Sequence, residues 1–310
     1  MMIKPKRLEK DDCIGVISPA SGFKDKKKAM KGIEYFESLG YKVKIGRNMF
    51  KIRGFLAGTD KERLADLHQM FADKKVDAII CLRGGYGTNR LLDSIDYKLI
   101  KNNPKIFCGY SDITALHLAF SKMTNLVTFH SPMVGAFTDT IKKFTINNLL
   151  DILTNPETQK EYPIPKGWKK LEVINKGKVK GRLVGGNLSL VVSTLGTPYE
   201  IDTKNKIVFL EDTGEESYRL DRYITHLLTA GKLSDASGII IGLNVDCEPK
   251  DKTRQSSREV LIERLKPLKK PLLLGFPFGH IKEQITIPYG IMALLDATNG
   301  KLILQEKCVI

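Results

Sequence analysis

Short apolar runs alternate with segments of helical spacing through the first half of the chain. The runs at 13–17, 76–82 and 106–108 predict strands, because each is short and lies between turn residues, and a further strand is expected at 41–45. In the segments between them, apolar residues recur three or four positions apart, as at Met30, Ile33 and Phe36, and predict helices. Alternating strands and helices are typical of a parallel sheet covered on both faces.

One of these helices carries its own start signal in the sequence. Thr59 and Glu62 have the spacing of a capping box, in which each side chain satisfies a backbone amide of the other residue. Leu64, Leu67 and Phe71 follow at helical spacing and predict the buried face.

The pattern fails between about residues 155 and 181, where prolines and lysines replace the periodic apolar positions. We therefore predict an N-terminal domain at 1–155, a linker at 156–180 and a C-terminal domain at 181–310. Further strands are expected in the second half at 206–210, 238–242, 272–274, 285–287 and 302–304. The predicted fold class is α/β with two domains, a Rossmann-like parallel sheet followed by a mixed sheet that closes in hairpins.

Composition narrows the class of protein. The chain has 310 residues, of which 42% are hydrophobic and 27% charged, as in an ordinary globular protein. It has no run of the ~18 to 20 apolar residues that span a bilayer, and residues 1–12 lack the apolar segment of an export signal. The five cysteines are widely spaced and odd in number, which favours reduced core residues. We expect a soluble, cytoplasmic protein that does not bind a membrane.

The charge of +15 is compatible with a nucleic-acid partner, an acidic substrate or a lysine-rich surface. The basic residues are scattered, and no aromatic residues interleave with their short clusters as stacking platforms. We therefore predict a solvated surface and no nucleic-acid partner.

Ser111 lies at the junction between the strand expected at 106–108 and a helix that begins near Ile113. Two interpretations of this serine are open. It can cap the helix, as serines commonly do, or its hydroxyl can project from the strand end as a nucleophile beside the unpaired amides that open the helix.

A serine nucleophile needs a base, and the chain has five histidines. Three fall within predicted helices, which favours structural roles: His68, His117 and His226. His130 ends a strand and stays a candidate, whereas His280 lies in a loop directly after Gly279. Glu211 and Asp212 end another strand, and the residues alone leave open which of them would orient the base.

Four motifs and one longer stretch occur in a fixed order along the chain. They are RGGYG at 83–87, GYSD at 109–112, GRLVGGNLSLVVSTLGTPY at 181–199, LED at 210–212, and GH at 279–280 followed by Pro288 and Gly290. Together they resemble the LD-carboxypeptidase family of serine peptidases, which includes murein tetrapeptide carboxypeptidases and microcin C immunity proteins.

The resemblance implies roles for individual residues. Ser111 would be the nucleophile, His280 the base and Glu211 the acid that orients it, at an active site where the two domains meet. Backbone amides of Gly85 and Asp112 would form the oxyanion hole. The family also implies a homodimer. An exopeptidase must recognise a chain end, so a cation is expected near the site. The candidate is Arg83, with Gly84 and Tyr86 beside it in the loop, although Arg83 could instead pack beneath the glycines.

The expected activity is hydrolysis of the LD peptide bond that releases a C-terminal D-amino acid, D-alanine being the expected one, from murein tetrapeptides in cell-wall recycling. An immunity peptidase acting on peptide or aminoacyl nucleotide conjugates is the alternative within the family, for which Trp168 could supply an aromatic contact. A non-catalytic protein that binds phosphate or another anion on RGGYG is the alternative of another class, although this loop matches neither a P-loop nor GxGxxG. No cofactor or metal is expected, since no cluster of His, Cys or acidic residues has ligand spacing.

Overall fold

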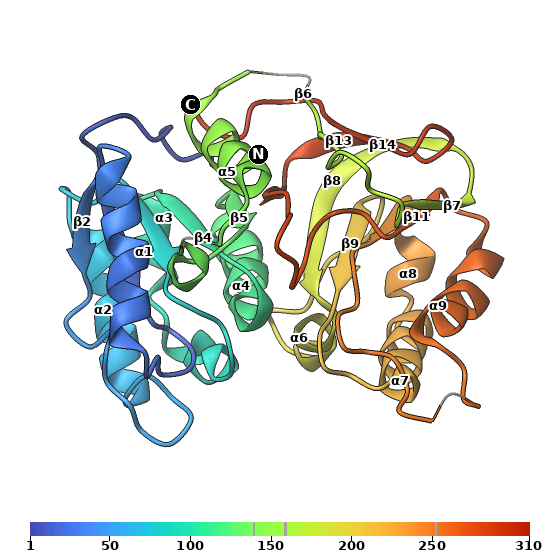
Figure 1. The fold of residues 1–310 in the computed structure, drawn as a ribbon, viewed down its shortest axis with the longest axis horizontal. Coiled ribbons are helices and arrows are strands. Elements are labelled where there is room, and N and C mark those ends of the chain that lie inside the picture. The colour runs from blue at the N-terminus through green and yellow to red at the C-terminus, as the bar shows by residue number, and fades with distance from the viewer. Residues whose placement is uncertain (139, 158–159, 252) are drawn as a thin grey trace. The chain divides into compact units, whose positions relative to one another are not determined.

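In the computed structural model, residues 1–138, 140–157, 160–251 and 253–310 are described, and the chain divides into two compact units (Figure 1). The first unit comprises Met1–Pro156, Thr286–Gly290 and Cys308–Ile310. The second comprises Glu157–Ile285 and Ile291–Lys307. The chain therefore passes between the units more than once.

The first unit is built on a six-stranded sheet with the order β12-β5-β4-β3-β1-β2. Its strands are β1 (Cys13–Ile17), β2 (Lys42–Ile45), β3 (Ala78–Cys81), β4 (Ile106–Gly109), β5 (Thr128–His130) and β12 (Ile287–Tyr289). All neighbouring pairs are parallel except β12 with β5, which is antiparallel. The predicted parallel sheet is thus confirmed, with one antiparallel strand at its edge.

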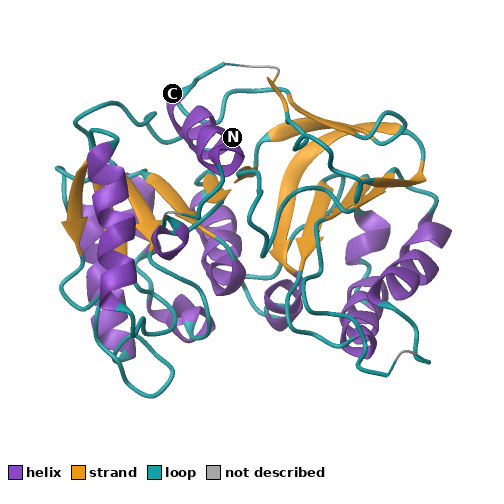
Figure 2. Cartoon of the chain, in the orientation of Figure 1, coloured by secondary structure: helices purple, strands orange, loops and turns teal. Residues whose placement is uncertain are grey.

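Helices connect these strands, as the spacing predicted (Figure 2). They are α1 (Lys26–Ser38), α2 (Asp60–Ala72), α3 (Tyr97–Asn102), α4 (Thr114–Thr124) and α5 (Lys143–Thr154), with 3₁₀ turns η1 (Thr88–Ser94), η2 (Ser111–Ile113) and η3 (Val134–Ala136). The capping box of α2 is confirmed: Thr59 Oγ1 accepts the Glu62 amide at 3.2 Å, and Glu62 Oε2 accepts the Thr59 amide at 2.8 Å.

The second unit contains an eight-stranded sheet with the order β6-β14-β13-β8-β9-β10-β11-β7. Its strands are β6 (Lys160–Glu161), β7 (Glu172–Asn175), β8 (Lys178–Asn187), β9 (Ile207–Glu211), β10 (Gly238–Ile241), β11 (Leu272–Leu274), β13 (Met292–Asp296) and β14 (Lys301–Leu304). Strands β8 to β11 are parallel to their neighbours in that run, and the remaining pairs are antiparallel. This is the mixed sheet that the sequence predicts, and β13 and β14 form a closing hairpin.

The helices of the second unit are α6 (Leu188–Ser193), α7 (Ser217–Thr229), α8 (Lys232–Asp235) and α9 (Ser257–Leu265), followed by the 3₁₀ turn η4 (Lys266–Leu268). Helix α6 begins directly at the end of β8, where the Asn187 side chain accepts the Leu190 amide at 3.3 Å as an N-cap.

The boundaries of the units differ from the expected ones at two places. The proposed linker at 156–180 contains β6, β7 and the start of β8, although Thr158 and Gln159 lie outside the described residues. The segment 181–310 is not continuous within one unit, because residues 286–290 and 308–310 belong to the first. The strand expected at 285–287 is β12, which completes the edge of the first sheet. An apolar run shows that a strand forms, but not which sheet it joins.

Candidate functional site

Three loops of the first unit leave the same edge of its sheet. The loop at 18–22 follows β1, the glycine loop at 83–87 follows β3, and Tyr110 and Ser111 follow β4. Strands β4, β3 and β1 are adjacent and parallel. The carboxyl edge of such a sheet is where α/β proteins bind ligands, so the three loops form one candidate region.

Ser111 has an uncommon backbone conformation. Its φ is +63°, in the left-handed region that costs a residue with a side chain about 1–2 kcal/mol. Neither η2 nor α4 has a side-chain cap, so the interpretation of Ser111 as a helix cap is wrong. A strained turn between a strand and a helix is the geometry that presents the nucleophilic serine of α/β-hydrolases.

The glycine loop lies directly against this serine. A Cβ added to Gly84 would come within 2.9 Å of the Ser111 Cβ and 3.2 Å of its Oγ. Gly85 has a φ of +115°, and a Cβ there would meet the Ser21 hydroxyl at 2.3 Å. The missing side chain of Gly84 therefore lets the loop approach Ser111, and that of Gly85 lets it approach Ser21.

Asp112 ties the serine turn to the glycine loop through its carboxylate. It accepts the Thr88 amide at 2.9 Å, while Thr88 Oγ1 donates to the Asp112 carbonyl at 2.5 Å. Burial raises the pKa of Asp112, and the bonds from Thr88 oppose that shift. Both the carboxylate and the backbone carbonyl of Asp112 are thus occupied by Thr88.

Arg63, in α2, is a positioning residue that the sequence analysis missed. Its side chain is almost wholly buried, and Nη1 donates to the carbonyls of Pro19 and, at 2.9 Å, of Gly87. One guanidinium thus links the loop after β1 to the loop after β3. Its only sequence signal was an arginine within an amphipathic helix, which ordinarily indicates a solvated residue.

In the second unit, His280 and Glu211 form a hydrogen-bonded pair. His280 Nδ1 lies 2.7 Å from Glu211 Oε2, and the Glu211 side chain is wholly buried. Gly279 makes this approach possible: its φ is +107°, and a Cβ there would lie 2.7 Å from Glu211 Oε2. Burial alone would lower the pKa of His280, but the hydrogen bond and charge of Glu211 outweigh it, so the pKa is raised.

Asp212, the other acid that the sequence left open, turns away from this pair. Its carboxylate accepts the amides of Ser189 at 2.9 Å and Thr213 at 2.8 Å, and the Asn187 amide group at 2.9 Å. Burial, together with the neighbouring Glu211, raises the pKa of Asp212 to about 6. Of the two acids, Glu211 is the one that contacts His280.

Asn187 is a second residue that the sequence analysis passed over. It ends β8 opposite Glu211 in the parallel register, and its Nδ2 lies 3.4 Å from Glu211 Oε1. Asn187 therefore connects both acids to the start of α6. A signal was present, since an asparagine directly after two glycines at a strand end is unusual within an apolar run.

The remaining histidines have other surroundings. His117 is buried, with its ring nitrogens 2.9 Å from the Gly109 carbonyl and 2.9 Å from Thr128 Oγ1, and burial lowers its pKa to about 4. His68 accepts the Asp96 amide at 3.0 Å. The buried His130 packs its ring against Tyr110, at 5.8 Å between centroids. His117 and His68 fit the structural roles that their positions predicted.

Arg83 packs beneath the glycine loop, the alternative that the sequence left open for it. Nε donates to the Gly84 carbonyl at 3.2 Å and Nη1 to the Gly22 carbonyl at 3.4 Å. Its guanidinium also lies 5.8 Å from the centre of the Phe23 ring. Tyr86, by contrast, exposes half of its side chain.

The predicted site residues thus fall into two groups. Ser111, Asp112 and the loop residues Arg83, Gly84, Gly85 and Tyr86 lie in the first unit, whereas Glu211 and His280 lie in the second. Within the described ranges, no group of three or more His, Cys, Asp and Glu side chains could hold a metal ion. None of the helices in those ranges is long and apolar enough to cross a membrane.

A strained serine beside a glycine loop, and a histidine held by a buried carboxylate, are the parts of a serine hydrolase. The model of the LD-carboxypeptidase N-terminal domain matches residues 14–131, and that of the C-terminal domain matches residues 180–295. The chain belongs to the LD-carboxypeptidase family.

Relatives and solved structures agree with this membership. A Bacillus subtilis protein named "Probable murein peptide carboxypeptidase" is 42% identical, over 97% of this chain and 94% of the relative. The crystal structure of muramoyltetrapeptide carboxypeptidase from Oxalobacter formigenes matches with a TM-score of 0.83 and 28% identity, over 94% of this chain and 97% of that one. The structure of MccF in complex with glutamyl sulfamoyl guanosine matches with a TM-score of 0.93 and 26% identity, over 99% of each chain.

Proposed function

We propose that this protein is a serine LD-carboxypeptidase that releases C-terminal D-alanine from murein tetrapeptides in cell-wall recycling. The observation that carries the proposal is the 42% identity, over nearly the full length of both chains, with a relative named as a murein peptide carboxypeptidase. The similarity to a muramoyltetrapeptide carboxypeptidase structure supports the same substrate class.

In the proposed mechanism, Ser111 Oγ attacks the carbonyl of the LD peptide bond while His280 Nε2 takes the hydroxyl proton. Glu211 accepts a hydrogen bond from the Nδ1–H of His280, which keeps Nε2 free to act as a base and stabilises the imidazolium. The tetrahedral intermediate collapses as His280 returns the proton to the leaving D-alanine amine. Water, deprotonated by His280, then attacks the acyl-serine ester, and His280 returns that proton to Ser111 Oγ as the retained peptide leaves with a new carboxylate.

Backbone amides are proposed to stabilise the oxyanion of that intermediate. The Asp112 amide follows the nucleophile in the chain, and the Gly85 amide belongs to the loop that packs against Ser111. Loss of one such donor typically lowers turnover on the order of 10² to 10³-fold. Arg83 is proposed to attract the terminal carboxylate of the peptide, with Gly84 and Tyr86 forming the adjoining loop surface.

The proposal includes a cytoplasmic location and a homodimer. All five cysteines are free, which suits a reducing compartment. Equilibrium sedimentation of the purified protein tests the dimer, and a monomer across the micromolar range would contradict it.

The central test is hydrolysis of L-alanyl-γ-D-glutamyl-L-lysyl-D-alanine. The wild-type protein is expected to release D-alanine, and Ser111→Ala is expected to lower kcat by about 10⁴-fold or more because the nucleophile is removed. Ser121→Ala, on the helix that follows, is the matched control and should retain full activity. Circular dichroism of both variants checks that the fold is kept.

Full turnover by Ser111→Ala would exclude the proposed mechanism. An anion-binding protein without activity, the alternative of another class, predicts no D-alanine release by any of the three proteins.

A second function within the family is favoured by one observation, the TM-score of 0.93 to MccF bound to an aminoacyl sulfamoyl nucleoside. Trp168 is held in the second unit, where its Nε1 donates to the Gly275 carbonyl at 2.8 Å. Cleavage of glutamyl sulfamoyl adenosine, measured beside tetrapeptide hydrolysis, separates the two functions. Activity on the conjugate alone would replace the murein proposal with the immunity function.

A further inference from the structure

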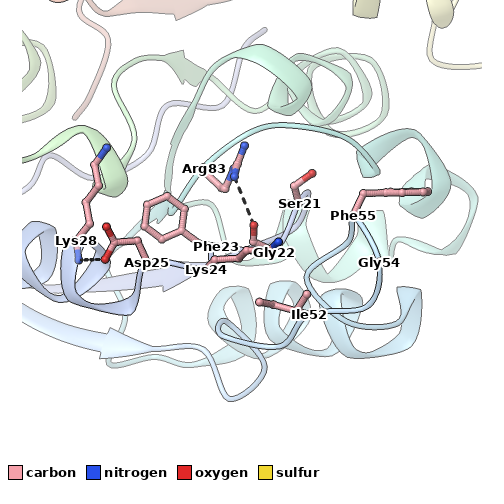
Figure 3. A pocket seen from close by; sticks show the side chains of 10 residues that line it. All are labelled: Ser21, Gly22, Phe23, Lys24, Asp25, Lys28, Ile52, Gly54, Phe55 and Arg83. Carbon is pink, nitrogen blue, oxygen red and sulfur yellow. Dashed lines mark hydrogen bonds between the residues drawn. The ribbon is translucent and has the colours of Figure 1, made fainter.

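A pocket of about 560 Å³ opens in the first unit beside the glycine loop (Figure 3). Ser21, in its wall, accepts the Tyr86 amide at 3.0 Å and donates its own amide to the Gly84 carbonyl at 3.4 Å. Gly84 in turn packs against Ser111. The pocket therefore adjoins the loop that touches the proposed nucleophile.

The pocket wall carries more positive than negative charge. Lys24, Lys28 and Arg83 line it together with one acid, Asp25. Asp25 already accepts the Lys28 amide at 2.9 Å as the cap of α1, and Arg83 donates to neutral carbonyls (Figure 3). Within the described part of the chain, none of the three cations forms an ion pair. Such a wall favours an anionic ligand.

Apolar surface is exposed at the same place. Phe55 lines the pocket with 63% of its side chain exposed, and its ring packs edge-on against Tyr86 at 5.2 Å between centroids. Ile52 and Phe23 add further apolar lining. Apolar walls with a few charged groups are typical of a site that binds a small organic molecule rather than a bare ion.

The size of the pocket indicates which part of a peptide it would take. A carboxypeptidase releases a single amino acid and retains the longer acyl portion until hydrolysis. A volume of about 560 Å³ lies in the range of sites for ligands of several residues or rings. The pocket thus suits the retained portion better than the leaving D-alanine.

We propose that this pocket binds the retained portion of the peptide substrate, and that Lys24 and Lys28 hold an internal carboxylate of that portion. The proposal rests on the proposed function for the identity of the substrate class. Phe55 and Tyr86 cover the apolar parts of the peptide, and Arg83, in the pocket wall, donates to the carbonyl of Gly84, which packs against Ser111.

The test measures binding without turnover, by calorimetry on the full-length Ser111→Ala protein. The probes are L-alanyl-γ-D-glutamyl-L-lysyl-D-alanine, which carries a free internal carboxylate on its D-glutamyl residue, and the same peptide with that carboxylate amidated. Amidation should weaken binding roughly tenfold, as loss of a hydrogen-bonded ion pair does. In the background of K24M/K28M, the two peptides should bind within a factor of about two of each other.

Lys27→Met is the matched control, because Lys27 is exposed on the same helix and does not line the pocket. It should leave the tenfold preference for the acidic peptide unchanged. A preference that survives in K24M/K28M, an equal loss of preference in Lys27→Met, or no measurable binding of either peptide would each overturn the subsite.

Failure of the proposed function gives a different result. A wild-type protein that releases no D-alanine, while Ser111→Ala shows the lysine-dependent preference, would overturn only the hydrolytic activity. Release of D-alanine without any preference between the two peptides would overturn only the subsite.

Discussion

At the scale of single residues, Ser111 and His280 are held in states that ordinary surface residues do not adopt. Ser111 has a left-handed backbone without being a glycine, and the buried Glu211 binds His280. The strain at Ser111 should be measurable as a difference in stability, and the effect of Glu211 on His280 as a shift in the pH dependence of activity. Two predictions follow from their physical causes.

The first concerns backbone strain at Ser111. Replacement by Ala keeps a Cβ in the left-handed region, whereas Gly relieves it, so Ser111→Gly should be more stable than Ser111→Ala by about 1 kcal/mol. Urea unfolding of the two variants measures the difference. The same pair of substitutions at Ser121, within α4, should give the opposite order, with Ala more stable by about 1 kcal/mol. The same order at both positions would show that Ser111 is unstrained in solution.

The second concerns the pH dependence of activity. A general base must be neutral, so kcat/KM should fall as the pH drops through the pKa of His280, which Glu211 raises above its usual 6.5. Glu211→Gln removes the charge that raises this pKa. The acid limb of the profile should therefore move to lower pH, and the plateau should fall on the order of 10² to 10⁴-fold.

Glu216→Gln, five residues further along, is the control for the pH profile. Glu216 is not among the charges that shift the His280 pKa, so both limb and plateau should match the wild type. An acid limb that stays in place in Glu211→Gln would contradict the proposed pairing during catalysis.

At the scale of elements, the site in each unit is made by loops at the carboxyl ends of parallel strands. In the first unit, β1, β3 and β4 are followed by Ser21, Gly84 and Ser111. In the second, β8 and β9 end on Asn187 and Glu211, which face each other in the register. Neighbouring parallel strands thus bring together residues that are far apart in the sequence.

A substitution at Gly84 tests whether the packing of the glycine loop against Ser111 is needed for activity. Gly84→Ala would force a Cβ to within 2.9 Å of the Ser111 Cβ, so the loop or the serine must shift. We expect kcat to fall about 100-fold, because small misplacement of reacting groups is costly, with a fold that stays intact by circular dichroism. Gly40→Ala is the control: its φ is +90° and a Cβ there meets nothing within 4 Å. That variant should lose about 1 kcal/mol of stability and no activity. Unchanged kcat in Gly84→Ala would refute the argument.

At the scale of the whole molecule, the first unit is completed by segments from the far end of the chain. Strand β12 pairs with β5, and the backbone of Ile310 accepts the Arg7 amide at 2.8 Å and donates to the Pro5 carbonyl at 3.0 Å. Val309, which directly precedes Ile310, is fully buried. The first unit therefore depends on residues 286–290 and 308–310, which are distant in the sequence from the rest of it.

Deletion of residues 308–310 tests this dependence. The loss of the buried Val309 and of two backbone hydrogen bonds should lower the free energy of unfolding by about 2–4 kcal/mol. Urea unfolding measures it. Ile310→Ala, which changes a side chain that is 58% exposed, should stay within about 0.5 kcal/mol of the wild type. A deletion no more harmful than Ile310→Ala would show that the terminus does not stabilise the unit.

The local elements were predictable from the sequence because their causes are local. The capping box at Thr59 and Glu62 depends on residues three apart, and helix α1 on apolar residues within one turn of each other. The motifs around Ser111, Glu211 and His280 could also be recognised in the sequence, since each motif consists of consecutive residues. The assignment of these residues as nucleophile, acid and base stays a prediction.

Where two residues or two sheets were equally compatible with the local sequence, only the tertiary structure distinguished them. Glu211 and Asp212 are adjacent acids at one strand end, and the long-range approach of Gly279 distinguishes them. The sequence predicted a strand close to β12. The sheet that β12 joins is determined by its pairing with β5, more than 150 residues earlier in the chain. The left-handed φ of Ser111 likewise occurs where the serine packs against Gly84, a residue distant in the sequence. Local patterns specify which backbone forms, whereas side-chain partners and sheet neighbours depend on contacts that the chain makes only once it has folded.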